Sequence, residues 1–437
     1  MTPVARLSAA IEVLADIDAR RRPAADALKD WGLAHRFAGS GDRAAIAGLA
    51  YDALRRRASA AWIMGEETPR AILLGMLRLE RALDLDAVAA LCSGARFAPL
   101  PLSETERSRL AAPNLADAPP WVAGDYPEWL DVHFARVFAE ERAAELGALA
   151  ARAPLDLRVN TLKADRDKAA AALSELAFEP TRWSPLGLRL RLRADAKSPA
   201  IHAEPAFLKG MAEVQDEGSQ LAALLAGAKR GEQVVDLCAG AGGKTLALAA
   251  VMENHGQIYA TDGDKRRLAP IHARLERAGA RNVQVRTPRG NADVLSDLAG
   301  RADLVLIDAP CTGIGAWRRN PDAKWRVRPG SLATRRKEQE AALERAAALV
   351  KPGGRIAYVT CSVLAEENDD QVHAFLSRHP AFALVPPARV CDPLGERAYL
   401  FRRAVLMSDA GLLMTPARTD TDGFFVSVLR KSLPASR

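Results

Sequence analysis

The first part of the chain repeats apolar residues three and four positions apart. The stretches 43–62 and 70–83 show this spacing most clearly, with charged residues at the positions between. Such a period is typical of amphipathic helices, and residues 5–91 carry almost no strand-like alternation. We therefore expect an all-helical domain over residues 1–95.

Six prolines within residues 96–128 interrupt this pattern and indicate a linker. Residues 128–152 return to helical spacing, and the segment 155–205 combines strand-like runs with one helix-like run. We therefore predict, over residues 129–205, a helical segment followed by a small α+β subdomain.

Beyond residue 205, runs rich in β-branched and other apolar residues alternate with helix-like runs. The strand-like runs lie at 233–238, 257–262, 282–286, 303–308, 355–360 and 423–430. Strands that alternate with helices predict a doubly wound, mostly parallel sheet. The expected fold class is therefore α/β, with a Rossmann-like domain over residues 206–437.

Composition narrows the class of protein. Of the 437 residues, 49% are hydrophobic and 26% are charged, as in ordinary folded proteins. No apolar run approaches the 18 or so residues that span a membrane, and the N-terminus lacks a signal-peptide pattern. The five cysteines show no CxxC spacing, which argues against a disulfide framework and a structural zinc site. We expect a cytoplasmic monomer that binds neither metal nor membrane.

The net charge of +7 is unevenly distributed along the chain. Residues 1–150 carry 18 Lys and Arg against 21 Asp and Glu, whereas the remainder carries 43 against 33. A basic surface commonly attracts nucleic acid. The composition is also rich in Arg and poor in Lys, as base bias in a genome produces, so charge alone leaves both interpretations open.

The run VVDLCAGAGGKT (234–245) predicts a strand, a glycine-rich turn and the start of a helix. Glycines there let the backbone approach a ligand near the helix N-terminus. A phosphate loop would need glycine at Cys238 and a dinucleotide fingerprint would need glycine at Thr245, so both nucleotide interpretations weaken. S-adenosylmethionine uses the same turn with an acidic residue ending the next strand. Asp262 stands there, although such an aspartate is also common as a helix cap.

Two cysteines, Cys311 and Cys361, each follow a strand-like run. The carboxyl ends of strands form one edge of an open α/β sheet, so both thiols are expected at one site. A thiolate that adds to carbon 6 of cytosine activates carbon 5 for methylation, and a second residue then has a task in releasing the product. Asp308, if burial raised its pKa, could donate to the ring edge, and Lys244 could supply positive charge.

Four runs of the sequence together resemble a known family. They are FLKGMAEVQDEGSQ (207–220), VVDLCAGAGGKT, DAPCTGIGAWRRNPDAKWR (308–326) and YVTCSVLAEEN (358–368). With them the chain resembles the Sun/RsmB family of RNA cytosine-5 methyltransferases over essentially its whole length. LRVNTLK (157–163) is similar to the RNA-binding subdomain of that family, and residues 41–57 are similar to the NusB-type helical domain of its members that act on small-subunit rRNA.

The resemblance implies roles for individual residues. Cys361 would be the nucleophile, Cys311 would assist product release, and Asp308 and Lys244 would complete the catalytic site. The cofactor S-adenosylmethionine would contact Cys238, Ala239, Gly240, Ala241, Gly242, Gly243, Lys244, Asp262, Asn291 and Asp308. The implied substrate is a cytosine in RNA, expected to be 16S rRNA.

The chain departs from the family pattern at two places. Ala241 replaces a proline that the family usually has, which changes the stiffness of the turn. The acidic residue expected after the third strand is missing, and Asn291 or Asp293 is expected to take its place near the adenine.

Basic residues follow Cys311, and two tryptophans lie among them. We expect the basic side chains to contact RNA phosphates; they are Arg318, Arg319, Lys324, Arg326 and Arg328. Trp317 and Trp325 suit either stacking on a base or packing in a core.

Other functions compete with this interpretation. A DNA cytosine-5 methyltransferase would take its nucleophile from a Pro-Cys pair, which would select Cys311 and leave Cys361 without a task. A methyltransferase acting on tRNA or another RNA would carry the same motifs. A non-catalytic RNA-binding factor for ribosome assembly would have no need for the two thiols, Asp308 and the glycine-rich turn.

Overall fold

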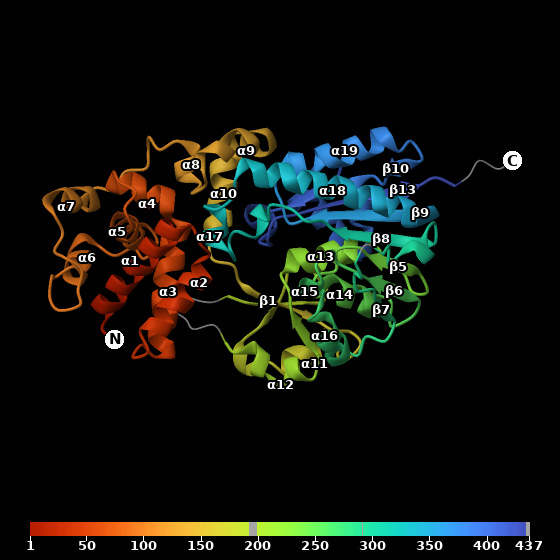
Figure 1. Cartoon of the computed structure of the whole chain (residues 1–437), viewed down its shortest axis with the longest axis horizontal. Helices are drawn as coiled ribbons and strands as arrows, with labels where there is room; N and C mark the ends of the chain where they lie inside the picture. Colours follow the sequence, from red (N-terminus) through yellow and green to blue (C-terminus); the bar gives the residue numbers. More distant parts are fainter. Residues whose placement is uncertain (192–198, 291, 434–437) are drawn as a thin grey trace. The chain divides into compact units, whose positions relative to one another are not determined.

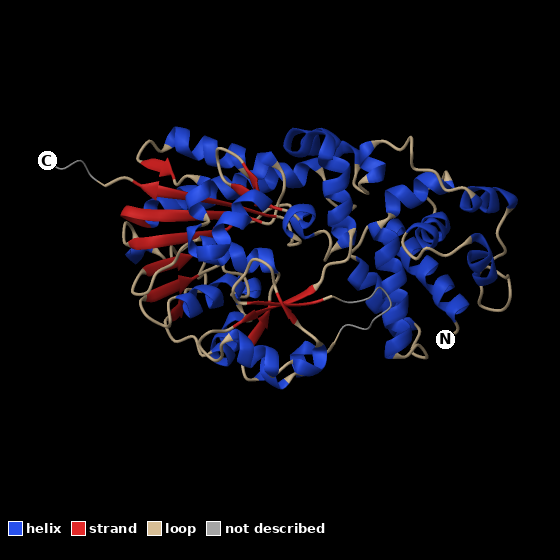
Figure 2. Cartoon of the chain, turned by 180° about the vertical axis from the view of Figure 1, so that it is seen from behind, coloured by secondary structure: helices blue, strands red, loops and turns tan. Residues whose placement is uncertain are grey.

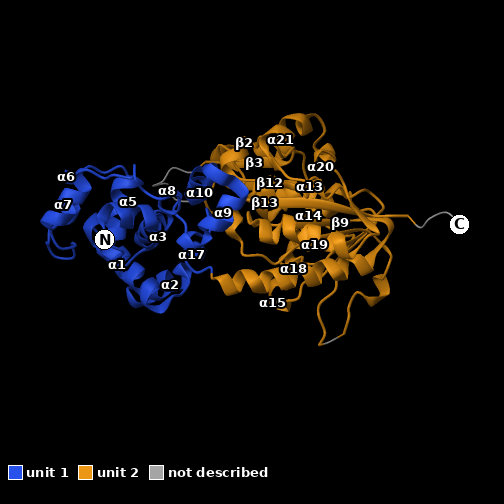
Figure 3. Cartoon of the chain, turned by 90° about the horizontal axis from the view of Figure 1, so that it is seen from above, with its two compact units in different colours: residues 1–152, 193–197, 317–327 blue, residues 153–192, 198–316, 328–437 orange. Residues whose placement is uncertain are grey.

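The computed structural model describes residues 1–191, 199–290 and 292–433, which fall into two compact units (Figure 3). Unit 1 contains residues 1–152 together with 317–327. Unit 2 contains the other described residues. The chain therefore leaves unit 2 after residue 316 and returns to it at residue 328.

Unit 1 is helical throughout (Figure 1). Its helices are α1 (Pro3–Arg20), α2 (Ala24–Ala34), α3 (Ser40–Arg55), α4 (Arg57–Met64), α5 (Pro69–Leu79), α6 (Leu85–Leu91), α7 (Glu104–Ala111), α8 (Pro120–Ala123), α9 (Asp131–Phe138), α10 (Arg142–Ala150) and α17 (Pro321–Lys324). Two of them, α7 and α8, lie within the proline-rich residues 96–128. Residues 96–128, predicted to be a linker, therefore contain two short helices in addition to irregular segments.

The helices of unit 1 form where the sequence supplies caps and an apolar face. The Thr2 hydroxyl accepts a hydrogen bond from the backbone of α1, and Gly65 ends α4 in the left-handed conformation. In α1, Leu7, Leu14 and Ile17 recur at helical spacing and are buried in the core of the unit. The predicted helical character of the N-terminal region is confirmed.

Unit 2 contains a small antiparallel sheet and a large mixed sheet (Figure 2). The small sheet has the order β2 (Glu179–Pro180), β3 (Gly187–Leu190), β1 (Leu155–Val159) and β4 (Ala212–Val214). One face is apolar, and there Leu157 packs in a hydrophobic cluster with Leu173. Asp156, the residue before Leu157, points to the opposite face because side chains alternate along a strand.

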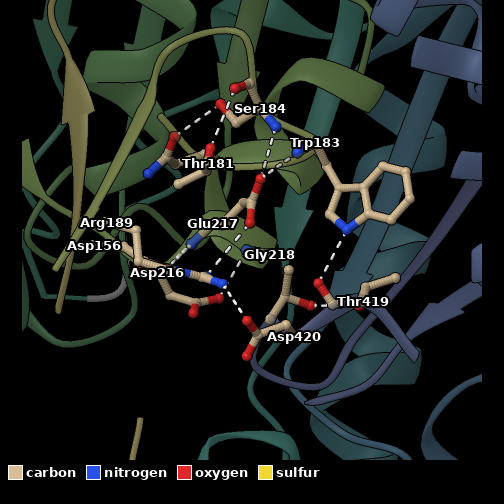
Figure 4. Close-up of polar contacts among 12 residues, drawn as sticks. Asp156, Thr181, Trp183, Ser184, Arg189, Asp216, Glu217, Gly218, Thr419 and Asp420 are labelled. Atoms are coloured by element: carbon tan, nitrogen blue, oxygen red, sulfur yellow. Dashed lines mark hydrogen bonds and ion pairs between the residues drawn. The ribbon is translucent and has the colours of Figure 1, made fainter. Parts of the chain in front are cut away.

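Buried charged and polar groups join that opposite face to the large-sheet part of unit 2 (Figure 4). Arg189 forms an ion pair with Asp156 at 2.7 Å. Glu217, at the start of α13 (Glu217–Leu225), accepts hydrogen bonds from the backbone N–H groups of Trp183 at 2.6 Å and Ser184 at 2.8 Å. Because buried charges are costly unless they are paired, these contacts define how the small sheet lies on the large-sheet part.

The large sheet has the order β11 (Leu406–Met407), β12 (Leu412–Met414), β13 (Phe424–Lys431), β9 (Val350–Thr360), β8 (Ala302–Asp308), β5 (Gln233–Asp236), β6 (Gln257–Ala260) and β7 (Val283–Val285). Strand β10 (Phe382–Leu384) also pairs with β13. The five strands from β9 to β7 are parallel, and the C-terminal strands are antiparallel. The predicted α/β fold with a parallel-rich sheet is confirmed.

Helices cover the large sheet and link its strands. Those of unit 2 are α11 (Arg166–Ala171), α12 (Pro205–Leu208), α13, α14 (Gly243–Val251), α15 (Lys265–Leu268), α16 (Ile271–Ala278), α18 (Pro329–Leu349), α19 (Asp369–Arg378), α20 (Pro387–Val390), α21 (Ala398–Ala404) and α22 (Pro416–Thr419). Helices α13 and α14 pack together, and α18 packs on β8 and β9. Within the described ranges, no helix has both the length and the apolar character needed to cross a bilayer.

The strand order places a reversal between β5 and β8. The chain continues from β5 to β6 on one side of β5, whereas β8 pairs with its other side. In open α/β sheets the crevice beyond the carboxyl ends of strands at such a switch point is the usual ligand site. We therefore expect the functional site at the carboxyl ends of β5 and β8.

Candidate active site

A glycine-rich turn connects β5 to α14 at this edge. Gly240 and Gly242 both adopt positive φ, 51° and 83°. A Cβ atom on Gly242 would lie 2.5 Å from Cγ1 of Ile271, so no larger residue fits there. The turn therefore packs closely against α16 beside the N-terminus of α14, with Gly240 and Gly242 buried and the residues between and around them partly exposed.

Asp262 follows β6 and lies directly beside the turn. Its Oδ2 accepts a hydrogen bond from the Gly240 N–H at 2.9 Å, and its Oδ1 accepts one from the Asp264 N–H at 2.8 Å. The carboxylate is buried, and it lines a cavity of about 480 Å³ together with Asp293. Asp262 thus lies on a cavity beside the turn, its role toward a cofactor stays a prediction, and Asn291 lies outside the described residues.

Lys244 and Asp308 meet at the carboxyl ends of β5 and β8. The Lys244 Nζ donates to Asp308 Oδ2 at 2.7 Å and lies 5.0 Å from the centre of the Phe424 ring. Lys244 is buried and Asp308 is half-buried. The two groups are thus ionic partners at this edge of the sheet, and the hydrogen bond from Asp308 to the pyrimidine ring stays a prediction.

A further buried carboxylate, Asp236, lies behind this pair at the end of β5. The Thr245 hydroxyl donates to its Oδ2 at 2.7 Å, while its Oδ1 has no hydrogen-bond partner among the described residues. Burial raises the pKa of Asp236 to about 7. No motif predicted a role for this residue, although it lies two residues before the turn in VVDLCAG.

The two thiols predicted to share a site are in contact. The Sγ atoms of Cys311 and Cys361 lie 3.3 Å apart, and both residues are partly exposed. The hydrogen bond to Cys361, together with burial, raises the pKa of the Cys311 thiol well above its usual value. Cys311 therefore keeps its proton more firmly than an ordinary cysteine does.

The other cysteines lie in different surroundings. Cys92 and Cys391 are buried in the hydrophobic cores of units 1 and 2. Burial raises the pKa of Cys238, in the glycine-rich turn, so it is not an activated thiol. No group of three or more metal-ligating side chains occurs in the described part of the chain.

A buried glutamate, Glu367, holds the loop that carries Cys311. Its carboxylate accepts hydrogen bonds from Thr312, at 2.8 Å from the backbone N–H and 2.5 Å from the hydroxyl. Gln339 of α18 donates to the same carboxylate at 3.0 Å and to the Pro310 carbonyl at 2.9 Å. Glu367 thus positions the residues on either side of Cys311. Sequence left its role open, and it gave no signal for Gln339.

Backbone contacts hold the two cysteine loops together. The Gly315 N–H donates to the Cys361 carbonyl at 2.9 Å, and the Gly423 N–H donates to the Gly315 carbonyl at 2.8 Å. A Cβ atom on Gly315 would lie 2.1 Å from the Gly423 carbonyl oxygen, so the close approach requires glycine. The distance between the thiols is therefore set by the loops and not by the cysteine side chains alone.

The expectation that the basic residues after Cys311 contact phosphates is wrong for Arg318 and Lys324. Both are buried within unit 1, at 2% and 1% exposure. The Lys324 Nζ donates to the Arg55 carbonyl at 3.0 Å, and the Arg55 guanidinium donates to the Arg318 carbonyl at 2.6 Å. Trp317 is also buried, with its ring edge against Phe134. Lys324 folds into the helical core because a backbone carbonyl there satisfies its ammonium group.

Comparisons with known proteins agree with this geometry. The family described as 16S rRNA methyltransferase RsmB/F matches residues 222–430, and its ferredoxin-like domain matches residues 126–196. A probable ribosomal RNA small subunit methyltransferase B of Synechocystis is 32% identical over 308 residues, which cover 70% of this chain and 67% of that protein.

Two crystal structures are also similar. PH0851 is 27% identical with a TM-score of 0.71, covering 99% of each chain. A methyltransferase homolog from Pyrococcus horikoshii is 28% identical with a TM-score of 0.57, covering 71% of this chain and 97% of that one. The similarity to PH0851 therefore extends over both units of the chain.

Proposed function

The chain belongs to the RsmB/F family of 16S rRNA methyltransferases, and from this premise we propose that it methylates carbon 5 of a cytosine in 16S rRNA. The observation that carries the proposal is the contact of Cys311 with Cys361 at the switch-point edge of the sheet. One sulfur would attack the base and the other would assist its release. A single-thiol site would leave the second cysteine unexplained.

The residues of the glycine-rich turn and Asp262 fit the cofactor S-adenosylmethionine. The carboxylate of Asp262 suits the ribose hydroxyls, and the partly exposed residues on either side of Gly240 suit close approach of a ligand. Asp293, on the wall of the same cavity, is placed to replace the missing acidic contact to the adenine. When bound, S-adenosylmethionine supplies an electrophilic methyl group.

The protonation of the thiols supports Cys361 as the nucleophile. The raised pKa of Cys311 disfavours its thiolate, and we therefore assign the attack to Cys361. Its attack on carbon 6 makes carbon 5 nucleophilic. After methylation, a solvent base takes the carbon-5 proton, and the electron pair of that C–H bond re-forms the ring double bond as the bond between carbon 6 and sulfur breaks. Cys311 then donates a hydrogen bond to the departing Cys361 thiolate.

The Lys244–Asp308 pair supports the same step through charge. Addition of a thiolate loads negative charge onto the pyrimidine ring, and a fixed ammonium group nearby stabilises that charge. The half-buried Asp308 carboxylate is suited to accept a hydrogen bond from the exocyclic amino group of cytosine. This contact would distinguish cytosine from uracil, which has a carbonyl at that position.

Replacement of each cysteine tests the order of the two thiols. Cys361→Ala should lower methyl transfer to a 16S rRNA transcript by roughly 10⁴-fold or more, because no covalent adduct can form. Cys311→Ala should leave attack possible and accumulate a protein–RNA adduct, seen as a denaturation-resistant shifted band. Bisulfite sequencing of the transcript identifies the methylated atom.

The buried cysteines provide controls for this experiment. Cys92→Ala and Cys391→Ala should leave both the rate and the amount of adduct unchanged. An adduct trapped by Cys361→Ala would reverse the roles of the two thiols. Methylation of the transcript at a position other than carbon 5 of cytosine would contradict the proposed reaction.

A further inference from the structure

Helix α16 lies against the glycine-rich turn in two places. The Ile271 side chain fills the space next to Gly242. The Arg274 guanidinium donates a hydrogen bond to the Ala241 carbonyl at 2.8 Å. A backbone carbonyl between two glycines of positive φ is thus held by a side chain from another element.

The same arginine is fixed from the other side by the small sheet. Glu213 of β4 is buried, and its Oε2 accepts from Arg274 at 3.1 Å. Asn160, which follows β1, donates to the carbonyls of Gly210 at 2.9 Å and Ala278 at 2.8 Å, which ties the end of α16 to the small sheet. Helix α16 therefore connects the small sheet to the turn.

We propose that Arg274, held by Glu213, is a positioning residue that orders the glycine-rich turn for the cofactor. The inference rests on the proposed function, because it takes the turn to bind S-adenosylmethionine. Glycine-rich backbone has many accessible conformers, and ordering it on binding costs affinity. Fixing the Ala241 carbonyl beforehand lowers that cost. Arg274 itself touches neither cofactor nor substrate.

Arg277 provides a matched control one helical turn further along α16. It pairs with the same Glu213 carboxylate, at 2.5 Å, and its side chain is 22% exposed, as is that of Arg274. Its guanidinium lies over the Phe207 ring, 4.1 Å from the ring centre, and it makes no hydrogen bond to the turn. The two arginines thus differ in the contact that the proposal requires.

The test compares Arg274→Met with Arg277→Met in the full chain. Binding of S-adenosylhomocysteine is measured by calorimetry, which requires no turnover. We expect Arg274→Met to weaken binding on the order of tenfold, as loss of a charge-assisted hydrogen bond does, and Arg277→Met to change it less than twofold. In steady state, Arg274→Met should raise KM for the cofactor while kcat at saturating cofactor is kept.

Hydrogen exchange and a second variant complete the experiment. Amides of residues 237–243 should exchange faster in Arg274→Met but not in Arg277→Met. Glu213→Gln should weaken binding in the same direction, because it loosens Arg274. Equal affinity in both arginine variants, or a loss of kcat with KM unchanged, overturns the inference. Failure of the wild-type chain to bind S-adenosylhomocysteine refutes the proposed cofactor instead, and the inference with it.

Discussion

Among the described residues, two lysines are almost fully buried, and their amines have different partners. Lys244, at the switch-point edge of unit 2, forms an ion pair with Asp308 at 2.7 Å. Lys324, in the core of unit 1, donates to a backbone carbonyl, and burial lowers its pKa to about 7. The first amine is paired with a carboxylate, whereas the second is close to losing its proton at neutral pH.

The difference shows that burial alone does not identify a functional amine. Burial disfavours a charged group unless an opposite charge is in contact with it. Lys244 has such a partner in the half-buried Asp308, which ends β8 at the edge of the sheet that carries Cys311 and Cys361. Lys324 has a neutral carbonyl as its acceptor and serves the packing of α17 in unit 1. The partner, and not the depth of burial, separates the lysine proposed to be catalytic from the structural one.

Replacing Lys244 should produce the larger of the two effects on activity. We expect Lys244→Met to lower kcat for methyl transfer about 100-fold or more, because Asp308 loses its counter-charge and the ring charge loses its stabiliser. Lys324→Met serves as the control and should keep kcat within about threefold. Comparable losses of kcat in the two variants would contradict the proposal that Lys244, and not Lys324, acts in the reaction.

Glu367 allows the comparison to be extended to a buried carboxylate of the site. Glu367→Gln keeps the size of the side chain but presents an NH2 group to donors from Thr312 and Gln339. We expect methyl transfer to fall roughly tenfold as the Cys311 loop loses one hydrogen bond. The decay of the protein–RNA adduct, followed by rapid quenching at successive times, should also be slower in the variant. Unchanged adduct decay would show that Glu367 does not position Cys311.

The smallest effect on activity, but a distinct effect on stability, is expected from Lys324. Its pKa is about 7 in the folded chain and about 10.4 in the unfolded chain. Between these values the unfolded chain binds more protons, so the free energy of unfolding should rise with pH, by at most about 1.4 kcal/mol per pH unit. Thermal melting of unit 1 from pH 7 to pH 10 should show this rise, and Lys324→Met should flatten it. If stability rises with pH as steeply in Lys324→Met as in the unchanged chain, the pH dependence does not come from Lys324.

Much of the fold follows from local patterns in the sequence. The strands β5, β6 and β7 fall within the predicted strand-like runs, and β8, β9 and β13 overlap theirs, with β9 beginning five residues before the predicted run. The short strands β10, β11 and β12 were not predicted. Runs of two or three residues carry no period, and they become strands only by pairing with β13 and with one another.

The candidate site divides in the same way between local and distant information. Cys311 and Cys361 could be placed together because both follow strands of one parallel sheet. Gln339 could not be found, since it lies inside a long polar helix and acquires its role only through contact with Glu367. Lys324 was misjudged because lysine is usually exposed, and the carbonyl that satisfies it belongs to α3, far away in the sequence.

Residues 317–327 belong to unit 1 although they lie between two stretches of unit 2, so no single cut in the sequence separates the two units. A fragment that begins at residue 153 would retain Trp317 and Lys324 but lose the helices that bury them. The exposed indole would make such a fragment prone to self-association. The helical unit is therefore not a simple N-terminal extension, because its core draws on two separate stretches of the chain, residues 1–152 and 317–327, and the second begins a few residues beyond Cys311.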